Sequence, residues 1–263
     1  MIQSELSIGI VQSDIIWEDK FHNFEKYESL LSHRKGYDIV VLPEMFSCGF
    51  SVNTDKCAEE PKGESFEWMQ KMSKQMQSAF AASVPVRENN KIFNRFYFVM
   101  PDGSYFEYDK HHLFSYGGEH LLFSRGAERT IIDYKGWKIF PIVCYDLRFQ
   151  VWNSNRFVDG NYDYDMAICV ANWPQSRSHA WKTLLQARAI ENQAWLLASN
   201  RVGVDGMDLL YAGDSMVVNP YGEIQNTASQ IETVLEAKVS LDFLKSYREK
   251  FAFAADWDAF ELI

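Results

Sequence analysis

The sequence lacks several features that mark membrane, secreted and metal-binding proteins. Its 263 residues contain no apolar run long enough to span a bilayer. The first ten residues carry no lysine or arginine and lead into a strand pattern, so we expect no signal peptide. The four cysteines show no Cys-x-x-Cys spacing and no nearby histidine pair, which predicts reduced thiols and no zinc site. Together these absences predict a cytoplasmic protein without a bound metal.

Basic residues are also scarce relative to acidic ones. The chain has 26 lysines and arginines against 36 aspartates and glutamates, a net charge of −10 and a pI near 5.1. A negative field repels phosphate backbones and anionic lipids, so we expect neither a nucleic-acid partner nor a membrane partner. An anionic substrate would therefore need a local basic site.

No repeat, low-complexity tract or linker divides the chain. The composition, 47% hydrophobic and 24% charged, supplies enough apolar surface for one continuous core. We therefore predict a single domain over residues 1–263. The segment at about 240–263 is rich in aromatic residues, and we expect it to pack on the domain or on a partner subunit.

Short apolar runs alternate with amphipathic stretches along the chain. Helical spacing of apolar residues occurs at 24–31 and 64–78. Several strand patterns are joined by tight turns, which predicts an α/β protein with two mixed sheets flanked by helices. The expected strands are at 6–12, 37–42, 79–86, 91–100, 105–108, 130–133, 137–143, 163–171, 195–201, 215–219 and 233–238.

Cys144 is the cysteine whose position favours chemistry. It follows an apolar run and precedes polar residues, so it lies at the carboxyl end of a strand, where α/β proteins commonly build sites. Free backbone N–H groups at such a junction can stabilise an oxyanion. A buried structural cysteine is the alternative. Cys169 fits that alternative within a strand, whereas Cys48 and Cys57 fall in an expected polar loop and need no chemistry.

A cysteine nucleophile needs a base or a neighbouring cation at neutral pH. His111 or His112 would make the protein a Cys-His hydrolase, although adjacent strand residues face opposite sides and only one of them could reach the thiol. Glu44 and Lys110 are the other candidates, because both lie at the ends of predicted strands, as Cys144 does. Taken singly, each would be read as an ordinary surface charge.

Together the three residues resemble the nitrilase, or carbon-nitrogen hydrolase, superfamily. The matching motifs are Leu-Pro-Glu-Met-Phe at 42–46, Tyr-Asp-Lys-His-His-Leu-Phe at 108–114 and Ile-Val-Cys-Tyr-Asp-Leu-Arg-Phe at 142–149. The stretches at 171–177, 186–193 and 200–206 are most similar to the bacterial omega-amidase branch. Gln150 departs from the proline that relatives often carry there, which affects only the local turn. The resemblance implies a four-layer α-β-β-α sandwich and no cofactor.

The resemblance also implies a mechanism and a substrate class. Glu44 would act as the base, Cys144 as the nucleophile, and Lys110 with the backbone N–H of Tyr145 as oxyanion donors. Glu119 matches a second glutamate beside the lysine, with a solvent-facing carboxylate as the alternative. The branch hydrolyses the terminal amide of 2-oxoglutaramate and similar 2-oxo acid amides. The candidate substrate-binding residues are Tyr116, His120, Asn172, Trp173, Arg177 and Arg201, while Arg148 is expected to pair with Asp146.

Other functions share part of this pattern. A deaminated glutathione amidase, an N-carbamoyl hydrolase and a nitrilase would keep the Glu, Lys and Cys set with another substrate. A scaffold protein would keep the fold without catalysis, although the three intact residues argue against it. Members of the superfamily commonly pair, so the resemblance also implies a homodimer or a higher homo-oligomer.

Overall fold

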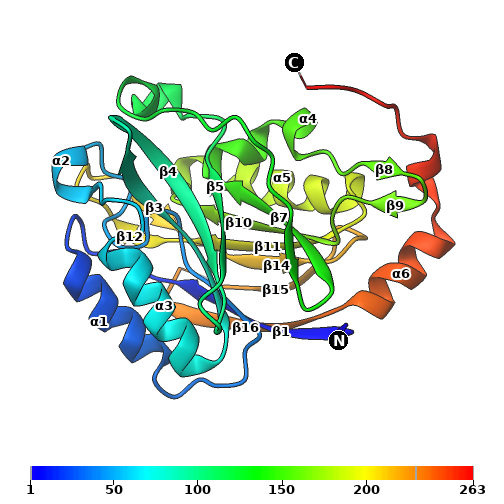
Figure 1. Ribbon diagram of the computed structural model, residues 1–263, viewed down its shortest axis with the longest axis horizontal. Helices are drawn as coiled ribbons and strands as arrows, with labels where there is room; N and C mark the ends of the chain where they lie inside the picture. Colours follow the sequence, from blue (N-terminus) through cyan, green and yellow to red (C-terminus); the bar gives the residue numbers. More distant parts are fainter. Residues whose placement is uncertain (1, 229, 263) are drawn as a thin grey trace.

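Two six-stranded sheets form the centre of the protein (Figure 1). The structure is a computed structural model that describes residues 2–228 and 230–262. The first sheet has the order β16 (Thr233–Ser240), β1 (Glu5–Gln12), β2 (Ile39–Val41), β3 (Ala79–Glu88), β4 (Lys91–Val99) and β5 (Tyr105–Asp109). The second has the order β15 (Ile224–Thr227), β14 (Met216–Val218), β11 (Trp195–Asn200), β10 (Met166–Ala171), β7 (Trp137–Val143) and β6 (Ile132–Tyr134). Two short hairpins, β8 (Phe157–Val158) with β9 (Asn161–Tyr162) and β12 (Val202–Val204) with β13 (Leu210–Ala212), stand apart.

Both sheets are mixed in the same way. Strands β1, β2 and β3 run parallel in the first sheet, as do β7, β10 and β11 in the second. The strands outside each trio pair antiparallel. The carboxyl ends of parallel strands meet at one edge of a sheet, so residues that follow β2 share an edge of the first sheet and residues that follow β7 share an edge of the second.

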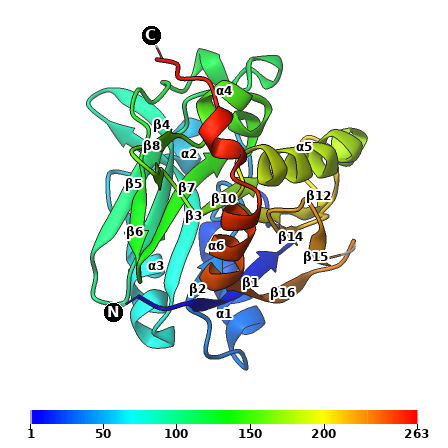
Figure 2. The same cartoon turned by 90° about the vertical axis from the view of Figure 1, so that its right-hand side faces the viewer.

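The two sheets pack face to face, and helices cover their outer faces. Alternate residues of β1 show the division, because Leu6, Ile8 and Ile10 belong to the core between the sheets, whereas Val11 faces the core under the helices. That second core joins the sheet to α1 (Lys20–Leu31) and α3 (Glu64–Met76). Helix α5 (Ser178–Glu191) covers β11 and β14 of the other sheet (Figure 2). The predicted arrangement of two mixed sheets between helices is confirmed.

Shorter helices complete the fold: α2 (Thr54–Cys57), α4 (Gln150–Asn153) and the C-terminal α6 (Leu241–Lys250). Helix α6 contacts its own chain, since Arg248 donates to the backbone oxygens of Gln193 and Tyr164 and pairs with Asp165. Within residues 2–228 and 230–262, no helix combines the length and the apolar character needed to cross a membrane.

Some local features differ from the sequence-based expectations. The prediction that Cys48 and Cys57 lie in polar surroundings is wrong. Both thiols are buried in an apolar cluster with Met45, Ile92 and Phe123. Strand β15 was not predicted, since every residue in it is exposed and its pattern carries no apolar alternation.

Candidate active site

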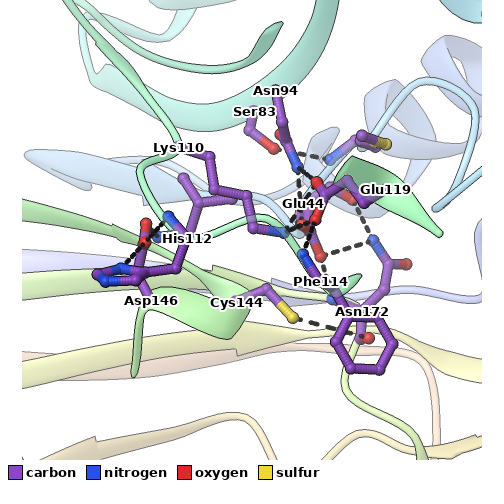
Figure 3. A network of polar contacts seen from close by, with 12 residues as sticks. Glu44, Ser83, Asn94, Lys110, His112, Phe114, Glu119, Cys144, Asp146 and Asn172 are labelled. Carbon is purple, nitrogen blue, oxygen red and sulfur yellow. Dashed lines mark hydrogen bonds and ion pairs between the residues drawn. The ribbon is translucent and has the colours of Figure 1, made fainter. Parts of the chain in front are cut away.

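Three strand ends bring charged and nucleophilic side chains together. Glu44 follows β2, Lys110 follows β5 and Cys144 follows β7, so two of the three come from the first sheet and one from the second. Figure 3 shows their side chains converging where the sheets meet. The predicted convergence of these strand ends is therefore present in the fold.

Lys110 is the centre of a buried ionic cluster. Its Nζ lies 2.9 Å from Oε1 of Glu44 and 3.0 and 2.9 Å from the two carboxylate oxygens of Glu119. All three side chains are 0% exposed. Burial alone would lower the pKa of Lys110, but Glu119 and Glu44 outweigh it and raise the pKa above the ordinary value. The lysine therefore stays protonated.

Glu119 is held from three sides, which excludes the solvent-facing alternative for its carboxylate. It lies in a short 3-10 turn (Glu119–Leu121), and the backbone N–H of Phe114 donates to its Oε2 at 2.5 Å. Burial raises the pKa of Glu119 above its usual value, and Glu44 acts in the same direction, whereas Lys110 opposes both. The two glutamates therefore share one cation within a site that excludes water.

The second carboxylate oxygen of Glu44 is held by the other sheet. The backbone N–H of Asn172, directly after β10, donates to Oε2 of Glu44 at 2.9 Å. The side-chain amide of Asn172 donates to the backbone oxygen of Glu44 at 2.7 Å. Glu44 is thus fixed in orientation by both halves of the sandwich.

Cys144 begins a tight turn directly after a buried strand. Its backbone has a φ of 46°, in the left-handed region that non-glycine residues seldom adopt. Such strained positions cluster at functional sites. Burial raises the pKa of the Cys144 thiol well above its usual value; Glu44 adds to the rise and Lys110 opposes it. The resting thiol is therefore neutral and needs a base before it can attack.

Asp146 connects the turn after Cys144 to the segment after Lys110. Its carboxylate accepts hydrogen bonds from the hydroxyl of Tyr108 at 2.9 Å and from His112. The expected pairing of Arg148 with Asp146 is wrong, because Asp146 is committed to these donors and the Arg148 guanidinium lies 4.7 Å from the centre of the Trp173 ring.

The two histidines lie after β5 rather than on it, and each is bound elsewhere. The Nδ1 of His112 donates to Asp146, and the ring stacks on Phe149 with 3.7 Å between ring centres. The Nδ1 of His111 donates to the backbone oxygen of Gly126 at 2.7 Å. Neither ring is oriented as a base for Cys144, and the buried carboxylate of Glu44 is the stronger candidate.

A cavity of about 210 Å³ opens over Cys144. Its walls are mainly apolar, and its charged lining comprises Lys110, Arg148, Arg177 and Asp205. The Arg177 guanidinium lies 5.2 Å from the centre of the Phe114 ring. Among the described residues, neither arginine forms an ion pair with an acidic side chain, so both guanidinium groups remain available to an anion. The lining comprises Trp17, Phe50, Val52, Lys110, Phe114, Gly117, Cys144, Tyr145, Arg148, Asn172, Trp173, Pro174, Arg177, Asp205, Met207, Leu209 and Tyr211.

The predicted substrate-binding residues divide into two groups. Asn172, Trp173 and Arg177 line the cavity, as does Tyr145. Tyr116 and His120 do not; Tyr116 is 87% exposed and His120 is also on the surface.

Arg201 has a structural position instead of a binding one. It is 0% exposed and does not line the cavity. Its Nη2 pairs with Asp14 at 3.0 Å and donates to the backbone oxygen of Ile15 at 3.2 Å. Its Nη1 has no hydrogen-bond partner within the described residues, but the side chain does not line the cavity, so we remove Arg201 from the substrate-binding set.

Asn94 and Arg148 are among the residues of the site that the sequence analysis did not identify. Asn94 is fully buried in β4 and donates to both Glu44 and Glu119. An asparagine within a strand whose other residues are mostly apolar and aromatic was the available signal. Arg148 was read as a structural residue, and only the three-dimensional position of Asp146 shows that it is free.

Known proteins resemble this chain over nearly its whole length. The sequence model of the carbon-nitrogen hydrolase family matches residues 7–249. An omega-amidase from Escherichia coli (strain K12) is 42% identical over 258 residues, covering 98% of each chain. The 2-oxoglutaramate amidase of Bacillus subtilis (strain 168) is 32% identical, covering 92% of this chain and 94% of its own.

A solved structure is similar to the same extent. It is a CN-hydrolase superfamily protein of Xanthomonas campestris, with a TM-score of 0.97 and 42% identity, covering 99% of this chain and all of its own. That structure is described as carrying an arsenic adduct in its active site.

Proposed function

Because this chain belongs to the carbon-nitrogen hydrolase family, we propose that it is an omega-amidase that hydrolyses the terminal amide of 2-oxoglutaramate through a thioester on Cys144. The protein is a cysteine-dependent amidase. The observation that carries the proposal is the cavity, where a cysteine lies near a buried carboxylate and ammonium and two arginines form no ion pair within the described residues. The relatives named as omega-amidase and 2-oxoglutaramate amidase support the substrate.

In the first half of the reaction, Glu44 takes the thiol proton as the sulfur of Cys144 attacks the amide carbon. The electrons of the carbonyl bond move onto oxygen, which accepts hydrogen bonds from Lys110 and from the backbone N–H of Tyr145. When the carbonyl bond re-forms, the carbon–nitrogen bond breaks, and the nitrogen takes the proton from Glu44 and leaves as ammonia. The acyl group remains on sulfur as a thioester.

The second half returns the enzyme to its starting state. Glu44 takes a proton from water, whose oxygen attacks the thioester carbon. The carbon–sulfur bond breaks, the sulfur regains the proton from Glu44, and 2-oxoglutarate is released. A carboxylate suits both halves because it alternates between base and acid, which a lysine held in its charged form does not.

Lys110 has one N–H left for the oxyanion. An ammonium carries three N–H donors; one faces Glu44, and we propose that the two oxygens of Glu119 share a second. Lys110 lines the cavity, so the third donor is available to the developing charge. A donor placed in this way in a largely buried site lowers the barrier by roughly 3 kcal/mol.

The carboxylate of the substrate requires a cation, because the protein carries a net charge of −10. We propose that Arg148 and Arg177 bind it from the cavity wall, in place of Arg201. Arginine suits this role because its planar fork matches the geometry of a carboxylate. Both side chains already stack on aromatic rings, which limits the rotamer freedom lost on binding.

The test is ammonia release from a panel of substrates. We expect 2-oxoglutaramate and 2-oxosuccinamate to exceed deaminated glutathione, an N-carbamoyl amino acid, a simple amide and a nitrile in kcat/KM. The Cys144→Ser variant should release no ammonia above background, and mass spectrometry of the wild type should detect the acyl adduct. If a panel member other than a 2-oxo acid amide is preferred, the proposed substrate is wrong.

We also propose a cytoplasmic homodimer or higher homo-oligomer. Unpaired thiols at all four cysteines fit a reducing compartment. Exposed apolar side chains around α5 and α6, such as Ile190, Tyr221 and Phe243, offer a contact surface. Light scattering of the purified protein decides the assembly state, and a monomeric mass at micromolar concentration would exclude the oligomer.

A further inference from the structure

Asn94 occupies an unusual position between the two glutamates of the site. Its Nδ2 lies 2.8 Å from Oε1 of Glu44 and 3.2 Å from Oε1 of Glu119. The Nζ of Lys110 donates to the same two oxygens. One amide nitrogen and one ammonium nitrogen therefore bridge the same pair of carboxylate oxygens (Figure 3).

The backbone of Asn94 contributes to the same arrangement. Its carbonyl oxygen accepts the backbone N–H of Lys110 at 3.0 Å. The main chain of Asn94 thus holds the backbone of Lys110. The side chain of Asn94 holds the two carboxylates that bind the ammonium group of Lys110. A single residue of β4 consequently controls both ends of Lys110.

The orientation of the amide follows from its neighbours. Carboxylates only accept hydrogen bonds, so the nitrogen of Asn94 must face Glu44 and Glu119. The remaining oxygen, Oδ1, is buried and has no hydrogen-bond partner within the described residues. An unsatisfied buried oxygen destabilises a fold, and an apolar side chain of similar size would avoid that cost. The asparagine is therefore poorly explained by stability alone.

We propose that Asn94 is a positioning residue that holds Glu44 and Glu119 together in their ionised forms through one amide nitrogen. Burial and the neighbouring Glu44 both favour the protonated form of Glu119. An N–H donor to both oxygens opposes this, because it stabilises the charged form. The base that takes the thiol proton then remains available at lower pH.

Four titratable groups surround this amide or the carboxylates that it bridges. They are Glu44 after β2, Lys110 after β5, Glu119 in its 3-10 turn and Cys144 after β7. Lys110 is positively charged and favours the ionised glutamates, whereas the glutamates oppose each other. Asn94 adds a neutral hydrogen-bond donor to this set. It therefore stabilises the carboxylates without placing a second cation beside the thiol of Cys144.

The inference rests on the proposed role of Glu44, and a pH profile tests it. In the Asn94→Leu variant, which removes both donors without adding charge, the acidic limb of kcat/KM should move up by about one pH unit. At neutral pH kcat should fall by about tenfold or more, KM should stay within about threefold, and raising the pH should restore most of the lost rate. Asn94→Asp should move the limb further, because it adds a third carboxylate.

Ser83→Ala is the matched control. Ser83 is fully buried and accepts the backbone N–H of Met45, the residue after Glu44, but touches neither carboxylate. Its removal should leave the acidic limb at the wild-type pH. If Asn94→Leu does not fold, as judged by circular dichroism, Asn94→Ala provides the same comparison in a smaller side chain without a donor.

Alkylation of Cys144 by iodoacetamide separates this inference from the proposed substrate. The sulfur forms a bond to the reagent carbon, iodide leaves, and the thiol proton passes to the carboxylate, so no amide substrate is needed. The pH profile of alkylation should move in the Asn94 variants as the kinetic limb does. If the wild-type enzyme is inactive on 2-oxoglutaramate, only the proposed substrate is wrong. If the Asn94 variants lose the same fraction of activity at every pH, and the acidic limb stays at the wild-type pH in both assays, the role of Asn94 is rejected.

Discussion

His112 donates to a single oxygen of Asp146 twice, from its backbone N–H at 2.8 Å and from its Nδ1 at 2.9 Å. Asp146 lies two residues after the nucleophile and His112 two residues after the lysine. This pair therefore fixes the distance between the segments that carry Cys144 and Lys110, although neither side chain has a step in the reaction.

Replacing Asp146 should destabilise the protein and reduce activity together. Asp146→Ala leaves the Tyr108 hydroxyl and two His112 donors without their buried acceptor, which costs about 3 kcal/mol or more. Urea denaturation measures the change in free energy of unfolding. Asp55→Ala is the control, because that side chain is 97% exposed, and it should change the stability by less than about 0.5 kcal/mol.

Glu44→Gln should lower kcat and leave substrate affinity nearly unchanged. Glutamine keeps an oxygen for the Asn172 N–H but removes the base, and a positioned base contributes about 10² to 10⁴-fold. Steady-state kinetics should show that loss in kcat with KM within about threefold. Retention of more than a tenth of the wild-type kcat would remove Glu44 from the role of base.

Activity should decline on acidification at a pH above the ordinary glutamate value. Burial raises the pKa of Glu119 above 4.5, so Glu119 gains a proton at a higher pH than a free glutamate does. Because catalysis requires the ionised pair, kcat/KM falls as the pH decreases through that raised value. A profile of kcat/KM from pH 4 to pH 9 tests this, and full activity maintained down to pH 4.5 would contradict it.

Arg148→Met should weaken binding of carboxylate substrates selectively. Loss of a charge-assisted pair should raise KM for 2-oxoglutaramate by about tenfold or more, since such bonds contribute about 1.5 to 3 kcal/mol. The kcat/KM for a simple amide without a carboxylate should stay within about threefold. Equal losses for both substrates would indicate damage to the cavity instead of a lost carboxylate contact.

Arg201→Met should have the opposite profile. The substitution leaves Asp14 without its buried partner and removes donors to three backbone oxygens, those of Ile15, Val202 and Val204. We expect a lower thermal midpoint, measured by calorimetry, and a KM within about threefold of wild type at a temperature where the variant is folded. A tenfold rise in KM would restore Arg201 to the substrate-binding set.

The sequence was sufficient to place Glu44, Lys110 and Cys144 after strands, and the family resemblance grouped them, but it did not show that the site is assembled from two sheets. It could not distinguish Arg201 from Arg148. The difference depends on which acidic groups lie nearby in space: Asp14 is 187 residues away from Arg201 along the chain, whereas Asp146, only two residues from Arg148, is bound to other donors.

The burial of Glu119 was equally inaccessible from the sequence. Tyr116 and Leu121 on the same segment are strongly exposed, so composition there is typical of a surface loop. Only the turn geometry around Gly118, with φ of 76°, directs the carboxylate inward while its neighbours face solvent. The resemblance to relatives, instead of any local pattern, suggested this residue.

The pairing of β1 with β16 has a consequence for biosynthesis. Ile8 of β1 pairs with Ala237 of β16, so β16 leaves the ribosome long after the strand with which it pairs. Until then β1 exposes unpaired N–H and C=O groups, which are prone to pair with another chain. Nascent chains stalled before β16 should therefore recruit chaperones, and the complete sheet should form only after translation has passed this last strand.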